Sequence, residues 1–85
     1  MPRYRIRMIN SQFESVDEAD YPSLDAVREI AIMTATKVAA EAVAEGEHTA
    51  AVELQIHEDV TLVARHVVTL SVANLIDDLQ SPDRT

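Results

Sequence analysis

The longest regular pattern of apolar and polar residues runs from Ser23 to Glu45. Apolar side chains recur there every three or four residues, which is the period of a helix with one buried face. Ser23 supplies the side-chain oxygen that an N-cap needs, and Gly46 is a residue type that commonly ends a helix. We therefore predict a helix over Ser23–Glu45 whose buried face consists of Leu24, Val27, Ala31, Ala35, Val38 and Ala42.

A second set of apolar residues on this helix lies away from the buried face: Ile30, Met33, Ala40 and Ala44, with Ile32 and Val43 at the other edge. Scattered apolar residues are normal on a protein surface. An apolar band away from the core also marks interfaces, of which a symmetric homodimer is the simplest. The pattern leaves both interpretations open and makes Ile30 and Met33 candidate interaction residues.

The N-terminal segment Arg3–Ile9 alternates between polar and apolar residues, as a half-buried strand does. Asn10-Ser11 is a candidate two-residue turn, because Asn tolerates a positive φ. A return strand over Gln12–Val16 then pairs Met8 with Phe13 and places the only phenylalanine on the inward face. We predict a first hairpin with this register.

The segment Asp17–Asp20 carries three acidic residues and shows no periodicity. Because like charges repel and stay in water, we predict a solvated loop that leads to the helix. The segment lacks the spacing and the glycine of an EF-hand loop, so we predict no divalent-ion site there.

The alternation over Val52–His57 predicts a third strand, and the β-branched residues of Thr61–Val72 predict a fourth. The turn between them begins at Glu58-Asp59, and its length decides which side chains face the core. A two-residue turn directs Thr61 and Arg65 inward. An odd-numbered turn, which we favour, directs Leu62, Ala64, Val68 and Leu70 inward and Val63 and Val67 outward.

The predicted order is β-β-α-β-β, an α+β fold in which two hairpins form an antiparallel sheet and one long helix packs on one face. Residues 1–80 are expected to form a single small domain. The spacing of apolar residues in Ala73–Gln80 allows a further helical turn, and Ser81–Thr85 is expected to be a flexible tail.

Composition narrows the classes of function. Seven Lys and Arg residues against 15 Asp and Glu residues give a net charge of −8, which argues against a general nucleic-acid binder. The absence of cysteine excludes disulfides, a thiol nucleophile and thiolate metal ligands. No uninterrupted run of about 18 apolar residues is present, and the N-terminus lacks the apolar core of a signal peptide. We expect a cytoplasmic protein without membrane association.

Two short motifs, Met1–Tyr4 (MPRY) and Tyr21–Arg28 (YPSLDAVR), flank the first hairpin and lead into the Ala-rich helix. They resemble a family of small bacterial proteins of unknown function, which open with M-P-R-Y and carry L-P-D-L-E-A-A-R at the helix entry. Here Arg5 and Ile6 replace an aromatic pair, Ser23 stands where that family tends to have Asp, and the last hairpin lacks its glycine turn. The resemblance implies the same element order and transfers no activity.

No arrangement of residues in the sequence predicts catalysis. A single glycine and no cysteine provide neither a nucleophile turn nor a phosphate-binding loop. Glu41 and Glu45 lie one helical turn apart, but such residues are typical of a solvated surface. His57 and His66 could meet across the second hairpin, yet a zinc site needs further ligands. We predict no enzyme activity, no cofactor and no metal.

The clearest functional feature is a row of arginines, Arg3, Arg5 and Arg7, on one face of the first strand. Alternate residues of a strand lie about 6.6 Å apart. In one interpretation the arginines pair with acidic neighbours, such as Glu14 across the hairpin, or Glu53 if the two hairpins adjoin. In the other, they bind an acidic protein partner or a phosphate backbone. The second interpretation makes Arg3, Arg5 and Arg7 candidate interaction residues.

Together these features favour a non-catalytic protein-association module. We expect it to form a homodimer through the off-core side of the helix or through an edge strand. The alternative is a nucleic-acid-linked regulator of an antitoxin-like type that uses Arg3, Arg5 and Arg7. That alternative rests on similarity of element order alone, and the net charge argues against it.

Overall fold

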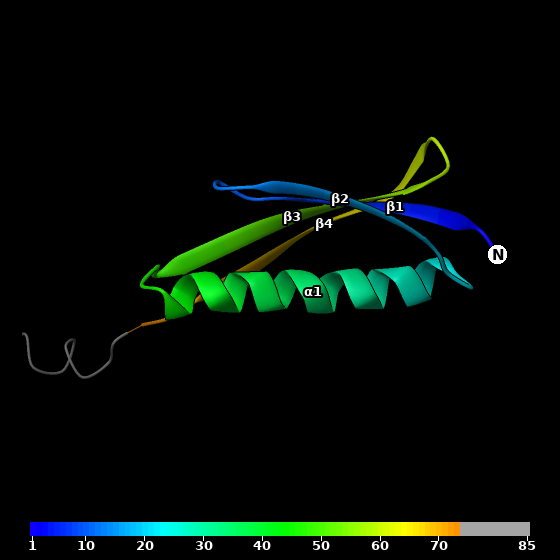
Figure 1. Ribbon diagram of the computed structural model, residues 1–85. Coiled ribbons are helices and arrows are strands. Elements are labelled where there is room, and N and C mark those ends of the chain that lie inside the picture. The colour runs from blue at the N-terminus through cyan, green and yellow to red at the C-terminus, as the bar shows by residue number, and fades with distance from the viewer. Residues whose placement is uncertain (74–85) are drawn as a thin grey trace, which may run out of the picture.

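The order of secondary-structure elements is the predicted one. The computed structural model describes residues 1–73 and contains β1 (Arg3–Ile9), β2 (Glu14–Asp20), α1 (Leu24–Ala44), β3 (Thr49–Glu58) and β4 (Thr61–Ser71). The strands form one antiparallel sheet in the order β2-β1-β3-β4, and α1 lies along one face of it (Figure 1). The α+β class is confirmed. The predicted helical turn over Ala73–Gln80, except its first residue, and the predicted tail Ser81–Thr85 lie outside the described residues.

Both ends of α1 are defined by the residues predicted to define them. The Ser23 Oγ accepts a hydrogen bond from the backbone N–H of Ala26 at 3.2 Å, and Gly46 has a φ of +123°. Gly adopts such a φ without the steric penalty of a side chain. The fully buried residues of α1 are Val27, Ala31, Ala35 and Ala39. Leu24 and Val38 are half-buried and pack against the core. The predicted face is confirmed, with Ala39 added and Ala42 only half-buried.

The core lies between α1 and the inner face of the sheet, and its buried strand residues come from β1 and β3. The helix contributes mainly alanines, which allow a close approach but add little apolar area. The larger side chains come from the strands: Tyr4, Ile6 and Met8 are between 3% and 8% exposed, and Val52, Leu54 and Ile56 are fully buried. The strand faces predicted from the two alternating patterns are confirmed.

The register of the first hairpin differs from the prediction. Met8 pairs with Ser15 rather than with Phe13. The connection contains four residues, Asn10 to Phe13, instead of two. The Asn10 Oδ1 accepts hydrogen bonds from the backbone N–H groups of Gln12 (2.7 Å) and Phe13 (2.8 Å). The asparagine side chain therefore stabilises a wider loop, and Phe13 lies exposed in it.

The acidic segment Asp17–Asp20 is the second half of β2, so the prediction of a solvated loop was wrong. Two cross-strand pairs explain the difference: Arg3 with Asp20, and Arg5 with Glu18. Oppositely charged residues across neighbouring strands attract each other and offset the repulsion within the acidic segment. Because β2 is an edge strand, these carboxylates also remain in water.

The turn between β3 and β4 contains two residues, Asp59 and Val60, and not an odd number. A register shift between Ile56 and His57 nevertheless leaves Val63 without a cross-strand partner. Such a bulge inverts the alternation of the bulged strand. The residues that pack against the core are therefore largely the predicted ones: Ala64, Val68 and Leu70.

Two predictions for β4 were wrong for the same reason. Leu62 lies before the bulge, pairs with His57 and is 50% exposed instead of facing inward. Val63, expected to face outward, is half-buried and packs against the core. Val67 is exposed, as predicted.

Candidate association surfaces

The outer face of the sheet carries the arginine row of β1, and every member of the row lies near a carboxylate of β2. The closest atoms are Arg3 Nη1 and Asp20 Oδ1 (3.5 Å), Arg5 Nε and Glu18 Oε1 (3.6 Å), and Arg7 Nη2 and Glu14 Oε2 (2.6 Å). The expected contact with Glu14 is present. Glu18 and Asp20 were missed as partners because their segment was expected to be a loop.

The pair formed by Arg7 and Glu14 is the tightest of the row. The Arg7 Nε also donates a hydrogen bond to Glu14 Oε2 at 2.6 Å. This hydrogen bond lowers the pKa of Glu14 and raises the pKa of Arg7. Both side chains are nevertheless well exposed, and exposed ion pairs contribute little to folding stability.

A second charged cluster lies around Glu53 on the same face. The Glu53 Oε2 accepts hydrogen bonds from Gln55 Nε2 (2.9 Å) and Arg65 Nε (2.7 Å). These two hydrogen bonds lower the pKa of Glu53. The hairpins do adjoin, since β1 pairs with β3, but the direct ionic partner of Glu53 is Arg65 and not an arginine of the row.

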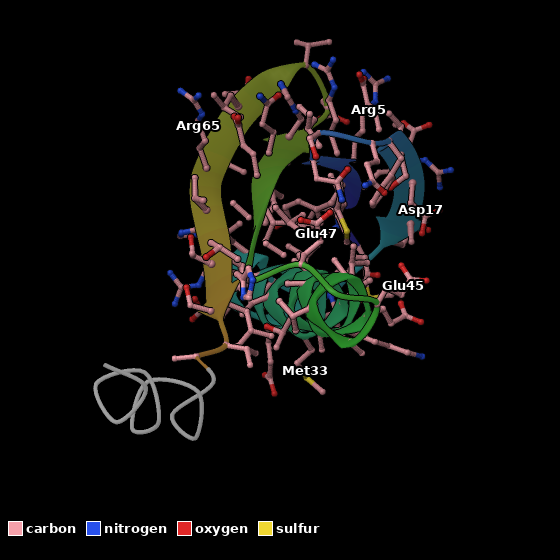
Figure 2. All side chains as sticks on the ribbon, turned by 90° about the vertical axis from the view of Figure 1, so that its left-hand side faces the viewer. Arg5, Asp17, Met33, Glu45, Glu47 and Arg65 are labelled. Atoms are coloured by element: carbon pink, nitrogen blue, oxygen red, sulfur yellow. The ribbon has the colours of Figure 1, made fainter. Side chains whose placement is uncertain are left out.

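The outer face of α1 contains the other two candidate residues. Ile30 is 46% exposed and Met33 is 62% exposed, and Met33 points away from the sheet (Figure 2). Ala40 and Ala44 are exposed on the same side. An apolar band therefore runs along the solvent side of α1, where the helical periodicity placed it.

Two opposite charges flank Met33 on this face. Glu29 lies four residues before Met33, and Lys37, the only lysine of the chain, lies four residues after it. Both are exposed, and neither forms an ion pair with another of residues 1–73. Positions four apart share one side of a helix. The equal spacing of Glu29 and Lys37 about Met33 is visible in the sequence, but it indicates an interaction surface only because Met33 is exposed.

Two adjoining cavities of about 260 and 250 Å³ lie between the Asn10–Phe13 loop and the C-terminal half of α1. Glu47 lines the first, and Glu41 and Glu45 line the second; Glu45 and Glu47 are labelled in Figure 2. The lining residues include no histidine, lysine or arginine. Carboxylates, amides, hydroxyls and apolar side chains alone do not define a reaction, so we assign none to these cavities.

The two histidines considered as metal ligands lie on opposite faces of the sheet. His57 pairs with Arg5 on the outer face, whereas His66 pairs with the buried Leu54 on the helix side. The Nδ1 of His57 and the Nε2 of His66 are each buried without a hydrogen-bond partner. Within residues 1–73, no three potential ligands are grouped in a way that could hold a metal ion.

No protein-family model, curated protein or solved structure matches this chain. In the part of the chain that the structure describes, no helix combines the length and apolarity needed to span a membrane. The functional proposals therefore depend on the geometry and chemistry of the surfaces described above.

Proposed function

We propose that the protein is a non-catalytic protein-association module that acts as a homodimer, with the outer face of α1 as its interface. The observation that supports this most directly is the exposed apolar band of α1, centred on Met33. Contiguous exposed apolar surface on a small soluble domain marks an interaction site. A domain of this size buries a limited core, so association also adds to its stability.

The band is complementary to a second copy of itself. When two α1 helices pack antiparallel around a two-fold axis at Met33, the two Met33 side chains meet at the axis. The equal spacing then brings Lys37 of each copy level with Glu29 of the other. Ala26 becomes level with Ala40 of the second copy, and these small side chains allow the helices to approach closely. Both halves of the contact are identical, as a two-fold interface requires.

The decisive substitution is Met33→Glu, which places two like charges beside the axis. We expect the dimer dissociation constant to rise at least about 100-fold, since central residues contribute about 2 kcal/mol or more and 1.4 kcal/mol is tenfold. Sedimentation velocity over a concentration series measures this. The matched control is Val60→Glu, which adds the same charge at a 94% exposed turn residue and leaves the dimer intact. A wild type that stays monomeric at the highest soluble concentration contradicts the proposal.

A charge exchange tests the antiparallel arrangement. Lys37→Glu and Glu29→Lys each place like charges level with one another and weaken the dimer. The double variant restores opposite charges at both ends and associates more tightly than either single variant. Failure of this rescue refutes the antiparallel geometry even where Met33→Glu dissociates the dimer.

The nucleic-acid alternative has less support. Each guanidinium of the arginine row already lies within 4 Å of a carboxylate of β2. A phosphate backbone, or an acidic protein partner, has to displace those carboxylates before it gains the same contacts. Retention on immobilised nucleic acid that falls steeply with added salt, and that a triple Arg→Ala variant abolishes, is the result that would favour the alternative.

A further inference from the structure

Among residues 1–73, nothing pairs with the outer edge of β4, which presents a long row of backbone groups. β4 spans 11 residues, and it is the last strand of the sheet on its side. The N–H of Val72 donates a hydrogen bond to the His48 carbonyl at 2.9 Å. In an antiparallel pair only every second residue directs its N–H and C=O groups to the partner strand, so the even-numbered residues of β4 from 64 to 70 bond to β3 in the same way. The residues between them direct their N–H and C=O groups away from the sheet: Arg65, Val67, Thr69 and Ser71.

The hydrophobic core is also incomplete at this edge. Val52, Leu54 and Ile56 of β3 are fully buried, whereas the inward side chains of β4 pack against the same core but remain partly exposed. On the outer face, Val67 is 63% exposed. A further strand beside β4 would cover apolar surface on both faces of the sheet.

The opposite edge of the sheet is protected. The N–H of Tyr21 donates to the Pro2 carbonyl at 3.2 Å, and the same alternation identifies the edge-facing residues of β2 as Glu14, Val16, Glu18 and Asp20. A strand that paired there would desolvate three carboxylates. Charged side chains commonly protect edge strands in this way. β4, in contrast, contains one arginine, one histidine and no carboxylate.

We propose that β4 pairs antiparallel with β4 of a second copy, forming a self-association surface separate from the face of α1. Charge favours a second copy as the occupant. Two copies with a net charge of −8 repel each other least where neither carries a carboxylate. A two-fold axis at Val67 sets Val67 against its counterpart and Arg65 against Thr69 of the other copy, so no like charges face each other.

This inference goes beyond the helix-mediated dimer, because the two surfaces share no residue. Because soluble oligomers usually have closed point-group symmetry, a protein that uses both is expected to assemble into a tetramer whose two kinds of two-fold axis are perpendicular. The sheet becomes continuous across one interface, and the helices pack across the other. Each interface can then be removed separately.

The test is Val67→Lys, which places two ammonium groups beside the axis of the β4 pair. We expect the wild-type mass to be that of a tetramer and the variant to have half that mass, measured by light scattering with size exclusion. The matched control is Val16→Lys, which makes the same change at an exposed edge residue of β2 and leaves the mass unchanged. Met33→Glu also halves the mass, and the double variant is a monomer.

The outcomes separate the two proposals. An unchanged mass for Val67→Lys, or an equal drop for Val67→Lys and Val16→Lys, overturns the β4 pairing and leaves the α1 interface untouched. An unchanged mass for Met33→Glu overturns the α1 interface only. Hydrogen exchange of the wild type covers the case in which Val67→Lys does not fold. The Val67 and Thr69 amides should exchange more slowly at high than at low protein concentration, and concentration-independent exchange overturns the pairing.

Discussion

The two hairpins of this small domain are stabilised by different interactions. In the β1–β2 hairpin, the outer face is a ladder of ion pairs and the loop is held by the side chain of Asn10. In the β3–β4 hairpin, the inward face is apolar except for His66, and α1 packs directly on it. The backbone of α1 lies closer to β3 and β4 than to β1 and β2, although the inward side chains of β1 belong to the same core. Both hairpins therefore contribute side chains to the core, and the β1–β2 hairpin adds three cross-strand ion pairs on its outer face.

This difference explains how an acidic chain can contain an arginine row. The guanidinium groups are balanced locally by carboxylates that lie on the neighbouring strand. Such a hairpin tolerates a solvated face, because none of its ionic side chains has to be buried. The β3–β4 hairpin has few charged residues that could pair across its strands, and its stability requires the helix on one face.

The largest effect that separates the hairpins comes from deleting an inward side chain. Leu54→Ala removes a fully buried side chain of β3 and should lower the free energy of unfolding by about 3 kcal/mol. Ser15→Ala changes the β2 residue opposite Met8, which is exposed, and should shift it by less than about 0.5 kcal/mol. Urea unfolding followed by circular dichroism measures both. Equal losses would show that the inward faces of β2 and β3 do not differ in their contribution to stability.

A smaller effect is expected at the loop of the β1–β2 hairpin. Asn10→Ala removes an oxygen that accepts two backbone hydrogen bonds, and should cost about 1 kcal/mol of unfolding free energy. Asn10→Asp keeps the acceptor and serves as the control, with stability close to that of the wild type. Should the alanine variant be as stable as the aspartate variant, the loop does not depend on this side chain.

The smallest effect is the pH dependence of the ion-pair ladder. The pKa of Glu14 lies below its usual 4.5 because of the hydrogen bond from Arg7, and the pKa of Glu53 lies below 4.5 because of Gln55 and Arg65. A carboxylate whose pKa is lowered on folding stabilises the folded state above the unfolded pKa. That contribution is lost as the pH falls through the lower, folded value.

We therefore expect unfolding midpoints to fall as the pH drops from about 5 towards 3, where the unfolded carboxylates bind more protons than the folded ones. Glu14→Gln should flatten this dependence, and 1 M salt should reduce it, since exposed pairs are screened. A Glu14→Gln variant with the same pH dependence as the wild type would exclude Glu14 as a contributor.

Sequence patterns were sufficient wherever the information lay within one element. The period of apolar residues in Ser23–Glu45 predicted the buried face of α1 and the exposed position of Met33, because a helix relates residues three and four apart by its own geometry. Likewise, alternation identified the inward residues of β1 and β3, since successive side chains of a strand point to opposite faces. Ser23 and Gly46 marked the ends of α1 for equally local reasons.

Only the tertiary structure decided how these elements are paired. Asp17–Asp20 is a strand because β1 places arginines opposite it, and no local preference of an acidic segment contains that information. The bulge at Val63 depends on the pairing of β4 with β3, whereas the four-residue loop at Asn10 is held by local hydrogen bonds that the prediction of a two-residue turn missed. Local preferences are properties of neighbours in the chain, whereas register and loop length are determined by the sum of contacts across strands. The surfaces left uncovered, and thus the proposed interfaces, follow from that sum.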